Sequence, residues 1–527
     1  MSQPSAKPIR RVLVANRGEI ARRIFRACRE LGVASVAVYS EVDAGSVWSR
    51  KADLSVPLDG VTATETYLNV DAILAAAREV GADAVHPGYG FLSENAEFAE
   101  ACARAGIKFI GPRPDAMRAL GSKVAARELA QAAGVPVIPG VDGAGKSLAE
   151  LESAAERIGY PILIKASAGG GGRGMRLVRE AGTFADALQA AQAEAESAFG
   201  DDHMLLERYF ERARHVEVQV LGDEHGHVVH CFERECSIQR RHQKIIEESP
   251  SPGITPELRQ DLTAAAVALA SQVGYTSAGT VEFLVDDHSG KFFMLEMNTR
   301  LQVEHPVTEL VTGLDLAAWQ IRIAAGEPLS FAQSDLTQRG HAFECRVYAE
   351  DPAAGFFPSA GRVAYYRAPA GPGVRCDDGI ATGSVVSPHY DAMLAKVITF
   401  GWDRHAALRR MSQAMADTVV LGLTTNIRYL QDILVHPAFE AGATSTRFLE
   451  EHFGGWQPEV GLGEDVWLAV AAFESLAGAS GGADSGIVDG SGDRLTDGDR
   501  DVDADGTRGG KWQTDPWGAT DAWRNVP

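Results

Sequence analysis

The chain has 527 residues, a length that predicts about three or four domains at ~100–200 residues each and excludes a single hydrophobic core. The formal net charge of −21 argues against nucleic acid or an anionic membrane as the main partner, because phosphate groups repel such a chain. No apolar run approaches the roughly 20 residues of a membrane span, and the six cysteines show no CxxC spacing, so we expect a cytoplasmic protein with reduced thiols and with neither a zinc site nor a disulfide framework.

The first part of the chain alternates strands with helices. An apolar strand begins at Arg11 and reaches a turn at Gly18, and the spacing of apolar residues then predicts a helix over 19–31. The same patterns predict a strand over 33–39, a helix over 71–80 and a strand over 84–90. Such alternation is typical of a parallel sheet, although the glycines do not match the GxGxxG pattern of dinucleotide-binding folds.

A glycine-rich run follows the predicted strand 162–165. The strand ends in Lys165, and residues 166–174 contain four consecutive glycines, which let backbone N–H groups approach phosphate oxygens and can hinge as a lid over a nucleotide. The run is not a P-loop, because GxxxxGK[ST] is absent, and the alternative is a flexible surface linker. Lys123 is a second candidate for phosphate binding, although a single lysine at a helix start is more often solvated.

The segment 233–244 is dense in cations and hydrogen-bonding groups. Its alternation predicts a strand end that leaves Arg240, His242 and Lys244 near one another, and such a cluster can hold a small anion. The alternative is a charged edge strand. His215 lies on another alternating strand, where a lone histidine is usually a structural group.

Acidic residues gather on a predicted hairpin. The strand 292–298 alternates sides with period 2, so Glu296 and Asn298 lie on the same face. A turn-rich connection joins it to an earlier strand, 277–285, which places Glu282 beside Glu296. Hard oxygen ligands on paired strands suit Mg²⁺ shared with the phosphates of a nucleotide.

The residues after this hairpin strengthen that interpretation. Arg300 and Glu304 follow the second strand within a few positions, which is far more polar chemistry than a strand end needs. The alternative, a hairpin whose solvated face happens to be acidic, explains two isolated glutamates but not this density.

The C-terminal part has a different pattern. Short strands over 341–348 and 362–367 precede a predicted helix over 404–415. A further helix is predicted over 464–477, before a stretch rich in glycine, aspartate and serine over 478–510 whose low hydrophobicity favours disorder. The last residues regain three tryptophans and resemble the start of another segment.

Five motifs in a fixed order carry a family resemblance. They are ANRGEIA from Ala15, HPGYGFLSEN from His86, GGGGRGM from Gly169, CSIQRRHQK from Cys236 and EMNTRLQVEHPVTE from Glu296. From about Ile9 to Phe453 the chain resembles biotin carboxylase, an ATP-grasp enzyme found alone in bacterial acetyl-CoA carboxylase and at the start of acyl-CoA and pyruvate carboxylase chains.

The resemblance implies a multidomain α/β and α+β fold. It places a Rossmann-like N-terminal biotin carboxylase domain at 1–121, an ATP-grasp domain at 122–330 with a mobile lid at about 138–210, a C-terminal mixed α/β biotin carboxylase domain at 331–454, and a tail at 455–527. The tail is expected to contain a helix, a mostly disordered acidic linker and the start of a region that leads to a biotinyl carrier.

The resemblance also assigns roles to single residues. ATP would be bound by Lys123, Lys165, Gly171, Gly172, Glu207, Arg208, Tyr209, Phe210, His215, Gln239, His242, Glu282 and Glu296. Mg²⁺ or Mn²⁺ would be bound by Glu282, Glu296 and Asn298. Bicarbonate would be bound by Lys244, Arg300, Gln302, Val303 and Arg346. The implied catalytic residues are Lys244, Arg300, Glu304 as general base, and Arg346, which would also bind biotin and pair with its enolate.

The implied reaction is ATP- and bicarbonate-dependent carboxylation of carrier-bound biotin through carboxyphosphate, catalysed by a carbon–nitrogen ligase. It would be the first half-reaction of an acyl-CoA carboxylase of the acetyl, propionyl or methylcrotonyl type. Met-Lys-Met is absent and nothing resembles a carboxyltransferase, so the expected partners are a biotin carboxyl carrier protein or domain and a carboxyltransferase subunit, in a homodimer or a larger complex.

Two questions stay open at this point. The segment 515–524 is similar to the lead-in of the domain before the biotinyl segment of acyl-CoA carboxylase α subunits, so the chain is expected to be either a truncated α subunit or a subunit served by a separate carrier. The alternative functions are another ATP-grasp ligase, such as a carbamoyl-phosphate synthetase half or a purine-pathway carboxylase, and a catalytically silent nucleotide-binding scaffold.

Overall fold

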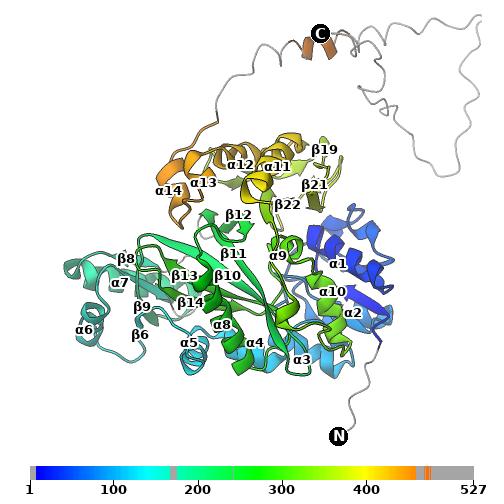
Figure 1. Ribbon diagram of the computed structural model, residues 1–527. Coiled ribbons are helices and arrows are strands. Elements are labelled where there is room, and N and C mark those ends of the chain that lie inside the picture. Colours follow the sequence, from blue (N-terminus) through cyan, green and yellow to red (C-terminus); the bar gives the residue numbers. More distant parts are fainter. Residues whose placement is uncertain are drawn as a thin grey trace, which may run out of the picture. The chain divides into compact units, whose positions relative to one another are not determined.

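Figure 1 shows the computed structural model of the chain, which divides into the units Met1–Pro458 and Glu459–Pro527. The structure describes residues 8–166, 175–240, 243–458, 468, 470–473 and 475, without the side chains of Lys123 and Phe199. Gly171, Gly172, His242 and the predicted segments 478–510 and 511–527 lie outside the described residues. The described part of the predicted helix 464–477 is helical. Among the described residues, no helix has the length and apolar character needed to cross a bilayer.

A parallel sheet of five strands forms the N-terminal region, in the order β3-β2-β1-β4-β5. The strands are β1 Arg11–Val14, β2 Ala34–Tyr39, β3 Leu54–Pro57, β4 Ala84–His86 and β5 Lys108–Phe109. The helices are α1 Gly18–Glu30, α2 Val70–Glu79, α3 Ala96–Arg104 and α4 Pro114–Gly121. The apolar side chains of α1, Ile20, Ile24 and Phe25 among them, are buried, which confirms the predicted alternation of strands and amphipathic helices.

A second sheet has eight strands and runs through the unit Met1–Pro458 (Figure 1). Its order is β14-β13-β10-β11-β12-β15-β22-β20. The strands are β10 Ala213–Gly222, β11 Val228–Arg240, β12 Gln243–Ser249, β13 Ser277–Asp286, β14 Phe292–Asn298, β15 His341–Tyr348, β20 Val374–Asp378 and β22 Met393–Gly401. Because β12 pairs with β15, the predicted ATP-grasp and C-terminal regions share one continuous sheet.

A smaller antiparallel sheet has the order β6-β9-β7-β8 and lies within the segment for which a lid is predicted. Its strands are β6 Gly140–Asp142, β7 Ile162–Ala166, β8 Arg176–Val178 and β9 Met204–Arg208, with helices α6 Leu148–Ile158 and α7 Phe184–Phe199. Ile162, Ile164, Phe184 and Leu206 form part of a separate apolar core, so this region has the packing of a unit of its own.

The other helices pack on the large sheet or at its ends. They are α5 Lys123–Ala132, α8 Pro256–Gln272, α9 His305–Thr312, α10 Leu316–Ala324, α11 Arg404–Asp417, α12 Ile427–Leu434, α13 Pro437–Glu440 and α14 Phe448–Phe453. Short strands complete the C-terminal region: β16 Glu350–Asp351, β17 Phe357–Pro358, β18 Gly361–Arg362, β19 Tyr365–Arg367, β21 Val385–Val386 and β23 Val419–Leu421.

One predicted strand is wrong. Residues 362–367 form two short strands, because the chain changes partner between them: β18 pairs with β21, whereas β19 pairs with β23. The N–H of Val363 donates to the carbonyl of Ser384 and the N–H of Ala364 to that of Leu421, which marks the point of exchange.

Candidate active site

Two carboxylates face each other on β13 and β14. Glu282 and Glu296 are direct partners in the antiparallel register, as the sequence predicts. Glu282 is buried, whereas Glu296 is exposed to a cavity. Desolvation and then the negative charge of Glu282 raise the pKa of Glu296. Within the described part of the chain, the Glu296 side chain makes no hydrogen bond or ion pair, so this pair of carboxylates has an open place for a cation.

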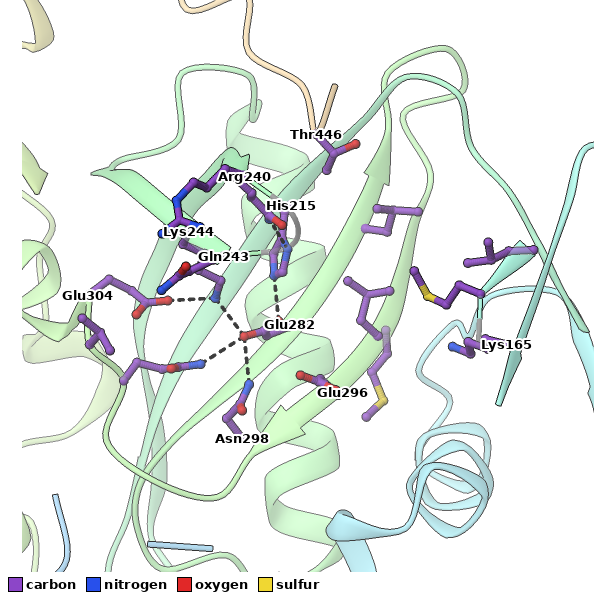
Figure 2. Close-up of a pocket in the computed structure, with 18 of the residues that line it drawn as sticks. Lys165, His215, Arg240, Gln243, Lys244, Glu282, Glu296, Asn298, Glu304 and Thr446 are labelled. Carbon is purple, nitrogen blue, oxygen red and sulfur yellow. Dashed lines mark hydrogen bonds and ion pairs between the residues drawn. The ribbon is translucent and has the colours of Figure 1, made fainter. Parts of the chain in front are cut away.

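Glu282 is the centre of a hydrogen-bonded cluster, shown in Figure 2. Its Oε1 accepts hydrogen bonds from Lys244 Nζ and Asn298 Nδ2, both at 2.8 Å, and from Gln302 Nε2 at 3.0 Å. Its Oε2 lies 2.8 Å from His215 Nε2. Burial alone would raise its pKa, but the charges of Lys244 and His215 outweigh burial and lower it. A divalent cation at this site would share these oxygens with the protein donors.

Lys244 is surrounded by acids. Its Nζ lies 2.6 Å from Glu217 Oε2 and 2.8 Å from both Glu282 Oε1 and Glu304 Oε1. Burial disfavours the charged ammonium, but the three carboxylates dominate and hold the pKa of Lys244 well above its ordinary value. The lysine is therefore a fixed positive charge at the centre of the site.

Glu304 lies between two cations. It lies in the turn that leads into α9, and its side chain is only 1% exposed. Arg346 donates to Glu304 Oε2 at 2.9 Å through one nitrogen and to Glu247 Oε1 at 2.6 Å through another. Burial would raise the pKa of Glu304, but Lys244 and Arg346 hold it well below the usual range. A ligand that competes for these cations would release the carboxylate.

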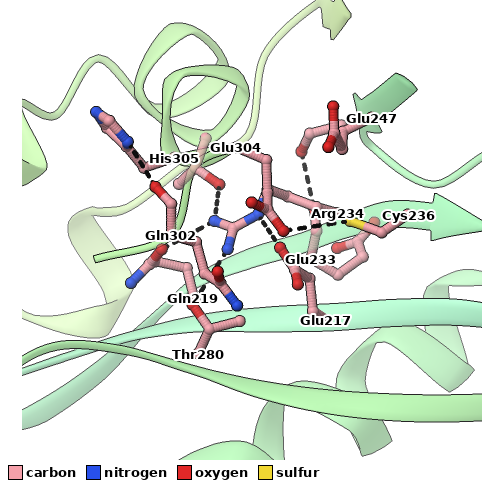
Figure 3. Close-up of polar contacts among 12 residues, drawn as sticks. Glu217, Gln219, Glu233, Arg234, Cys236, Glu247, Thr280, Gln302, Glu304 and His305 are labelled. Carbon is pink, nitrogen blue, oxygen red and sulfur yellow. Dashed lines mark hydrogen bonds and ion pairs between the residues drawn. The ribbon is translucent and has the colours of Figure 1, made fainter. Parts of the chain in front are cut away.

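A fully buried arginine, Arg234, binds Glu217 and neighbouring polar side chains close to Glu304 (Figure 3). Arg234 donates to Glu217 Oε1 at 2.5 Å, to Gln219 Oε1 at 2.8 Å and to Thr308 Oγ1 at 2.9 Å. Sequence reasoning missed both Arg234 and Glu217. The available signal was the pattern of charges in the two strands: Glu217 alternates with valines in one, and Arg234 stands between two glutamates in the other. A buried sheet tolerates such charges only when they are paired.

Arg300 contacts residues at the edge of the hydrogen-bonded cluster around Glu282. Its Nε donates to Glu94 Oε2 at 3.0 Å, and its terminal nitrogens donate to Gln302 Oε1 at 2.6 Å and to Asn298 Oδ1 at 3.0 Å. Glu94 belongs to the HPGYGFLSEN motif, for which the sequence suggested no role. Arg300 thereby connects the N-terminal region to the acidic hairpin.

The predicted ATP-binding residues line another part of the same cavity. Lys165 Nζ lies 2.5 Å from Glu207 Oε2 in the smaller sheet, and the Phe210 ring stacks on Phe293 with centroids 5.0 Å apart. The side-chain nitrogen of Gln239 lies 2.8 Å from His215 Nδ1. With Gln239 as donor, His215 Nδ1 accepts this hydrogen bond while its Nε2 faces Glu282. Lys123 is the first residue of α5, and the structure does not describe its side chain.

Arg240 of the predicted anion-binding cluster lines the same cavity as Lys244 but has a carboxylate partner of its own (Figure 2). Its guanidinium pairs with Glu350, with Nε 3.0 Å from Oε1, and lies 4.7 Å from the Phe356 ring centroid. In the register of β11 and β12, Arg240 is opposite Gln243 and Gln239 is opposite Lys244, so the two cations belong to different residue pairs of these strands. Lys244 alone of this pair reaches the carboxylate cluster.

A cavity of about 1650 Å³ connects these groups. Every predicted site residue with a described side chain lines it: Lys165, Glu207, Arg208, Tyr209, Phe210, His215, Gln239, Lys244, Glu282, Glu296, Asn298, Arg300, Gln302, Val303, Glu304 and Arg346. Asn16, Glu19 and Tyr89, from motifs without an assigned role, also line it. The volume exceeds the ~300–1,000 Å³ of a typical ligand pocket and is sufficient for a nucleotide together with a second substrate.

Most of the chain matches known protein families. Residues 8–117 match the family described as "Biotin carboxylase, N-terminal domain", residues 122–332 match "Carbamoyl-phosphate synthase L chain, ATP binding domain", and residues 344–451 match "Biotin carboxylase C-terminal domain". Biotin carboxylase of Haemophilus influenzae is 49% identical over 447 residues, which are 85% of this chain and 99% of that protein.

The chain belongs to the biotin carboxylase family. As a biotin carboxylase it is an ATP-dependent ligase with the three-domain mixed α/β architecture that the sequence predicts. The mitochondrial methylcrotonoyl-CoA carboxylase subunit alpha of Oryza sativa subsp. japonica is 50% identical over 84% of this chain, and the match spans 60% of that longer relative.

Solved structures agree with this biotin carboxylase fold. The biotin carboxylase domain dimer of 2-oxoglutarate carboxylase from Hydrogenobacter thermophilus, in complex with MgADP, ADP and bicarbonate, has a TM-score of 0.82 and 45% identity, covering 86% of this chain and 100% of that chain. Biotin carboxylase from Campylobacter jejuni, in a β-γ-ATP complex, has a TM-score of 0.81 and 43% identity, covering 84% and 99%. The predicted requirement for ATP, a divalent metal and biotin is therefore that of the family.

Proposed function

We propose that this chain carboxylates biotin on a carrier protein, as the first half-reaction of an acyl-CoA carboxylase. The observation that carries the proposal is the position of Glu304, a buried carboxylate between Lys244 and Arg346 and beside the Glu282–Glu296 pair. This arrangement combines a candidate base, two fixed cations and a metal-binding pair in one cavity.

The nucleotide and its metal ion would occupy the part of the cavity between the eight-stranded sheet and the smaller sheet β6-β9-β7-β8. Lys165 and the residues 207–210 would hold ATP there, together with Lys123, Gly171, Gly172 and His242. Glu282, Glu296 and Asn298 fit Mg²⁺ or Mn²⁺, because they offer carboxylate and amide oxygens and because the like charges of the two glutamates need a cation. When bound, the metal ion neutralises charge on the phosphates.

Bicarbonate would bind between Lys244, Arg300, Gln302, Arg346 and the backbone of Val303. The depressed pKa of Glu304 makes it a weak base while Lys244 and Arg346 pair with it. An incoming bicarbonate would share both cations and so raise the pKa of Glu304 toward the working range. Glu304 would then remove the bicarbonate proton as a bicarbonate oxygen attacks the γ-phosphorus, which gives carboxyphosphate and ADP.

The second step would use the same cations. Carboxyphosphate would decompose to CO₂ and phosphate, and this phosphate would take the N1 proton of biotin. Arg346 would stabilise the resulting enolate, which attacks CO₂ to form N-carboxybiotin. Glu247 would keep Arg346 in place during this step, because its contact with the arginine does not involve Glu304.

The partners are proposed from sequence and family together. A biotinylated carrier and a carboxyltransferase would complete the reaction, in a homodimer or larger complex, as in the dimeric Hydrogenobacter domain. The relatives include methylcrotonoyl-CoA, pyruvate and 2-oxoglutarate carboxylases, so the choice of an acyl-CoA rests on the likeness of 515–524 to acyl-CoA carboxylase α subunits. A cytoplasmic location stays a prediction.

The test is the rate of ADP release with ATP, Mg²⁺, bicarbonate and free biotin, and again with bicarbonate or biotin omitted. We expect release to depend on bicarbonate and to be stimulated by biotin. Arg346→Ala should lose the stimulation by biotin and keep ATP binding. Arg404→Ala is the matched control, because Arg404 also pairs with a buried glutamate, Glu248, but does not line the cavity. ADP release that ignores both bicarbonate and biotin would refute the proposal.

A further inference from the structure

The ANRGEIA motif contributes a buried acid to the wall of the cavity. Glu19 lies in the first turn of α1 and is 4% exposed. Its Oε1 accepts a hydrogen bond from the Tyr89 hydroxyl, and its Oε2 lies 3.2 Å from Lys396 Nζ. Burial raises the pKa of Glu19 to about 7, although Lys396 opposes this effect. Glu19 is thus a buried carboxylate that pairs with a lysine at the edge of the cavity.

Lys396 connects this acid to the catalytic turn. It lies on β22, directly opposite Arg346 on β15 and Asp377 on β20, and its side chain is fully buried. Its Nζ donates a hydrogen bond to the carbonyl of Val303 at 2.9 Å. Burial of an ammonium group is costly unless it is paired and hydrogen-bonded, so Glu19 and the Val303 carbonyl together stabilise Lys396 in this position.

The bond to Val303 acts on the residue that follows it. The peptide group between Val303 and Glu304 is planar, so a donor that fixes its carbonyl also fixes the position of the Glu304 Cα. The preceding carbonyl, that of Gln302, lies 2.8 Å from the ring nitrogen Nδ1 of His305. Two consecutive carbonyls of the turn are thus bound by side chains, and Glu304 extends from that turn to Lys244 and Arg346.

The chain segments in this contact are far apart in sequence. Glu19 comes from the first helix, Val303 from the turn after β14, and Lys396 from β22, near the end of the large sheet. A misplacement of about 1 Å at a reacting group can cost about 100-fold in rate. A rigid link from the sheet to the turn therefore has a direct consequence for the proposed proton transfer.

We propose that Lys396, anchored by Glu19, is a positioning residue that fixes the Val303–Glu304 peptide and thereby holds the general base and the bicarbonate site in place. The inference rests on the proposed function, because it assigns importance to Glu304. Lys396 touches no substrate in this proposal and acts through the peptide of Val303.

The test compares Lys396→Met and Glu19→Gln with wild type in bicarbonate-dependent ADP release. For Lys396→Met, we expect kcat/KM for bicarbonate to fall about 100-fold, while the Kd for ATP is unchanged. Glu19→Gln keeps an oxygen for Lys396 but removes its charge, so a loss of roughly tenfold is expected. In the double variant, the loss should be no larger than in Lys396→Met alone, because Glu19 acts through Lys396.

Arg22→Met is the matched control. Arg22 also lies on α1 and pairs with Asp378 on β20, but it does not contact the turn. It should therefore leave kcat/KM for bicarbonate unchanged. If Lys396→Met does not fold, Glu19→Gln, which preserves the shape of the side chain, decides the question by the same comparison of bicarbonate and ATP.

Two results would overturn the inference while the proposed function stands. One is a Lys396→Met or Glu19→Gln enzyme whose kcat/KM for bicarbonate stays within about twofold of wild type. The other is an equal loss of ATP affinity and bicarbonate efficiency, which general destabilisation would produce. Wild-type enzyme without any dependence on bicarbonate would instead refute the proposed function, and the inference with it.

Discussion

Replacement of Glu304 by glutamine is the perturbation with the clearest expected result. The amide keeps the size of the side chain but cannot take a proton, and general-base catalysis contributes about 10²–10⁴-fold to a rate. We therefore expect the kcat of bicarbonate-dependent ADP release to fall by about that factor. ATP binding should be kept, because Lys165 pairs with Glu207 and Gln239 with His215, whereas Glu304 pairs with Lys244 and Arg346.

The expected loss of stability follows from the contacts that remain. Removal of one partner from a buried ion pair costs about 3–5 kcal/mol when it leaves an unpaired charge. Lys244 keeps Glu217 and Glu282, and Arg346 keeps Glu247, so neither cation is left alone. We expect a smaller decrease in the free energy of unfolding, about 1–3 kcal/mol, measured by chemical denaturation.

Glu309→Gln is the control for this experiment. Glu309 lies on α9, pairs with Arg23 at 2.6 Å and with Arg375 at 2.7 Å, and does not line the cavity. It should lose stability and keep its turnover. A Glu304→Gln enzyme with kcat within about tenfold of wild type would refute the assignment of Glu304 as the base.

Three further predictions concern the metal, pH and the buried arginine. Glu296→Gln should raise the Mg²⁺ concentration for half-maximal activity at least about tenfold, because one carboxylate of the pair is lost; an unchanged Mg²⁺ titration would contradict the metal assignment. Burial raises the pKa of Glu247 to about 7, so the native state binds more protons than the unfolded state above pH ~4.5, and stability should fall as pH rises toward 7. Glu247→Gln should remove on the order of 3 kcal/mol of this decrease in unfolding experiments at pH 5 and 8, and an identical pH profile would contradict the shift. Arg234→Met should lower the free energy of unfolding by about 3–5 kcal/mol, and Arg234→Lys should not restore it, because lysine cannot reproduce the forked contacts; full stability in either variant would contradict the role of Arg234.

The sequence predicts the parts of the fold that depend on local pattern. The hairpin of β13 and β14 follows from period-2 alternation around a turn, and its register places Glu282 beside Glu296 as expected. Helix α1 is predicted within one residue at each end, because amphipathic periodicity and a following glycine define it.

The remaining contacts depend on pairings between distant strands, which no local pattern reveals. Glu217 lies on β10 and Lys244 on β12, the two strands that flank β11 in the large sheet, and their side chains pair with each other. Arg240 is bound by Glu350, 110 residues later, a partner that no local pattern indicates. The bond from Lys396 to Val303 spans 93 residues and joins a strand to a turn. The residue types of the site could thus be found from motifs, whereas their pairing required the structure.

The most direct test of the account follows the oxygen atoms of bicarbonate. If bicarbonate attacks the γ-phosphorus of ATP, one of its oxygens stays with the phosphate when carboxyphosphate decomposes. With ¹⁸O-labelled bicarbonate in unlabelled water, we predict that the phosphate released by this enzyme contains one labelled oxygen for each ATP cleaved. Phosphate whose new oxygen comes from water would contradict the central claim.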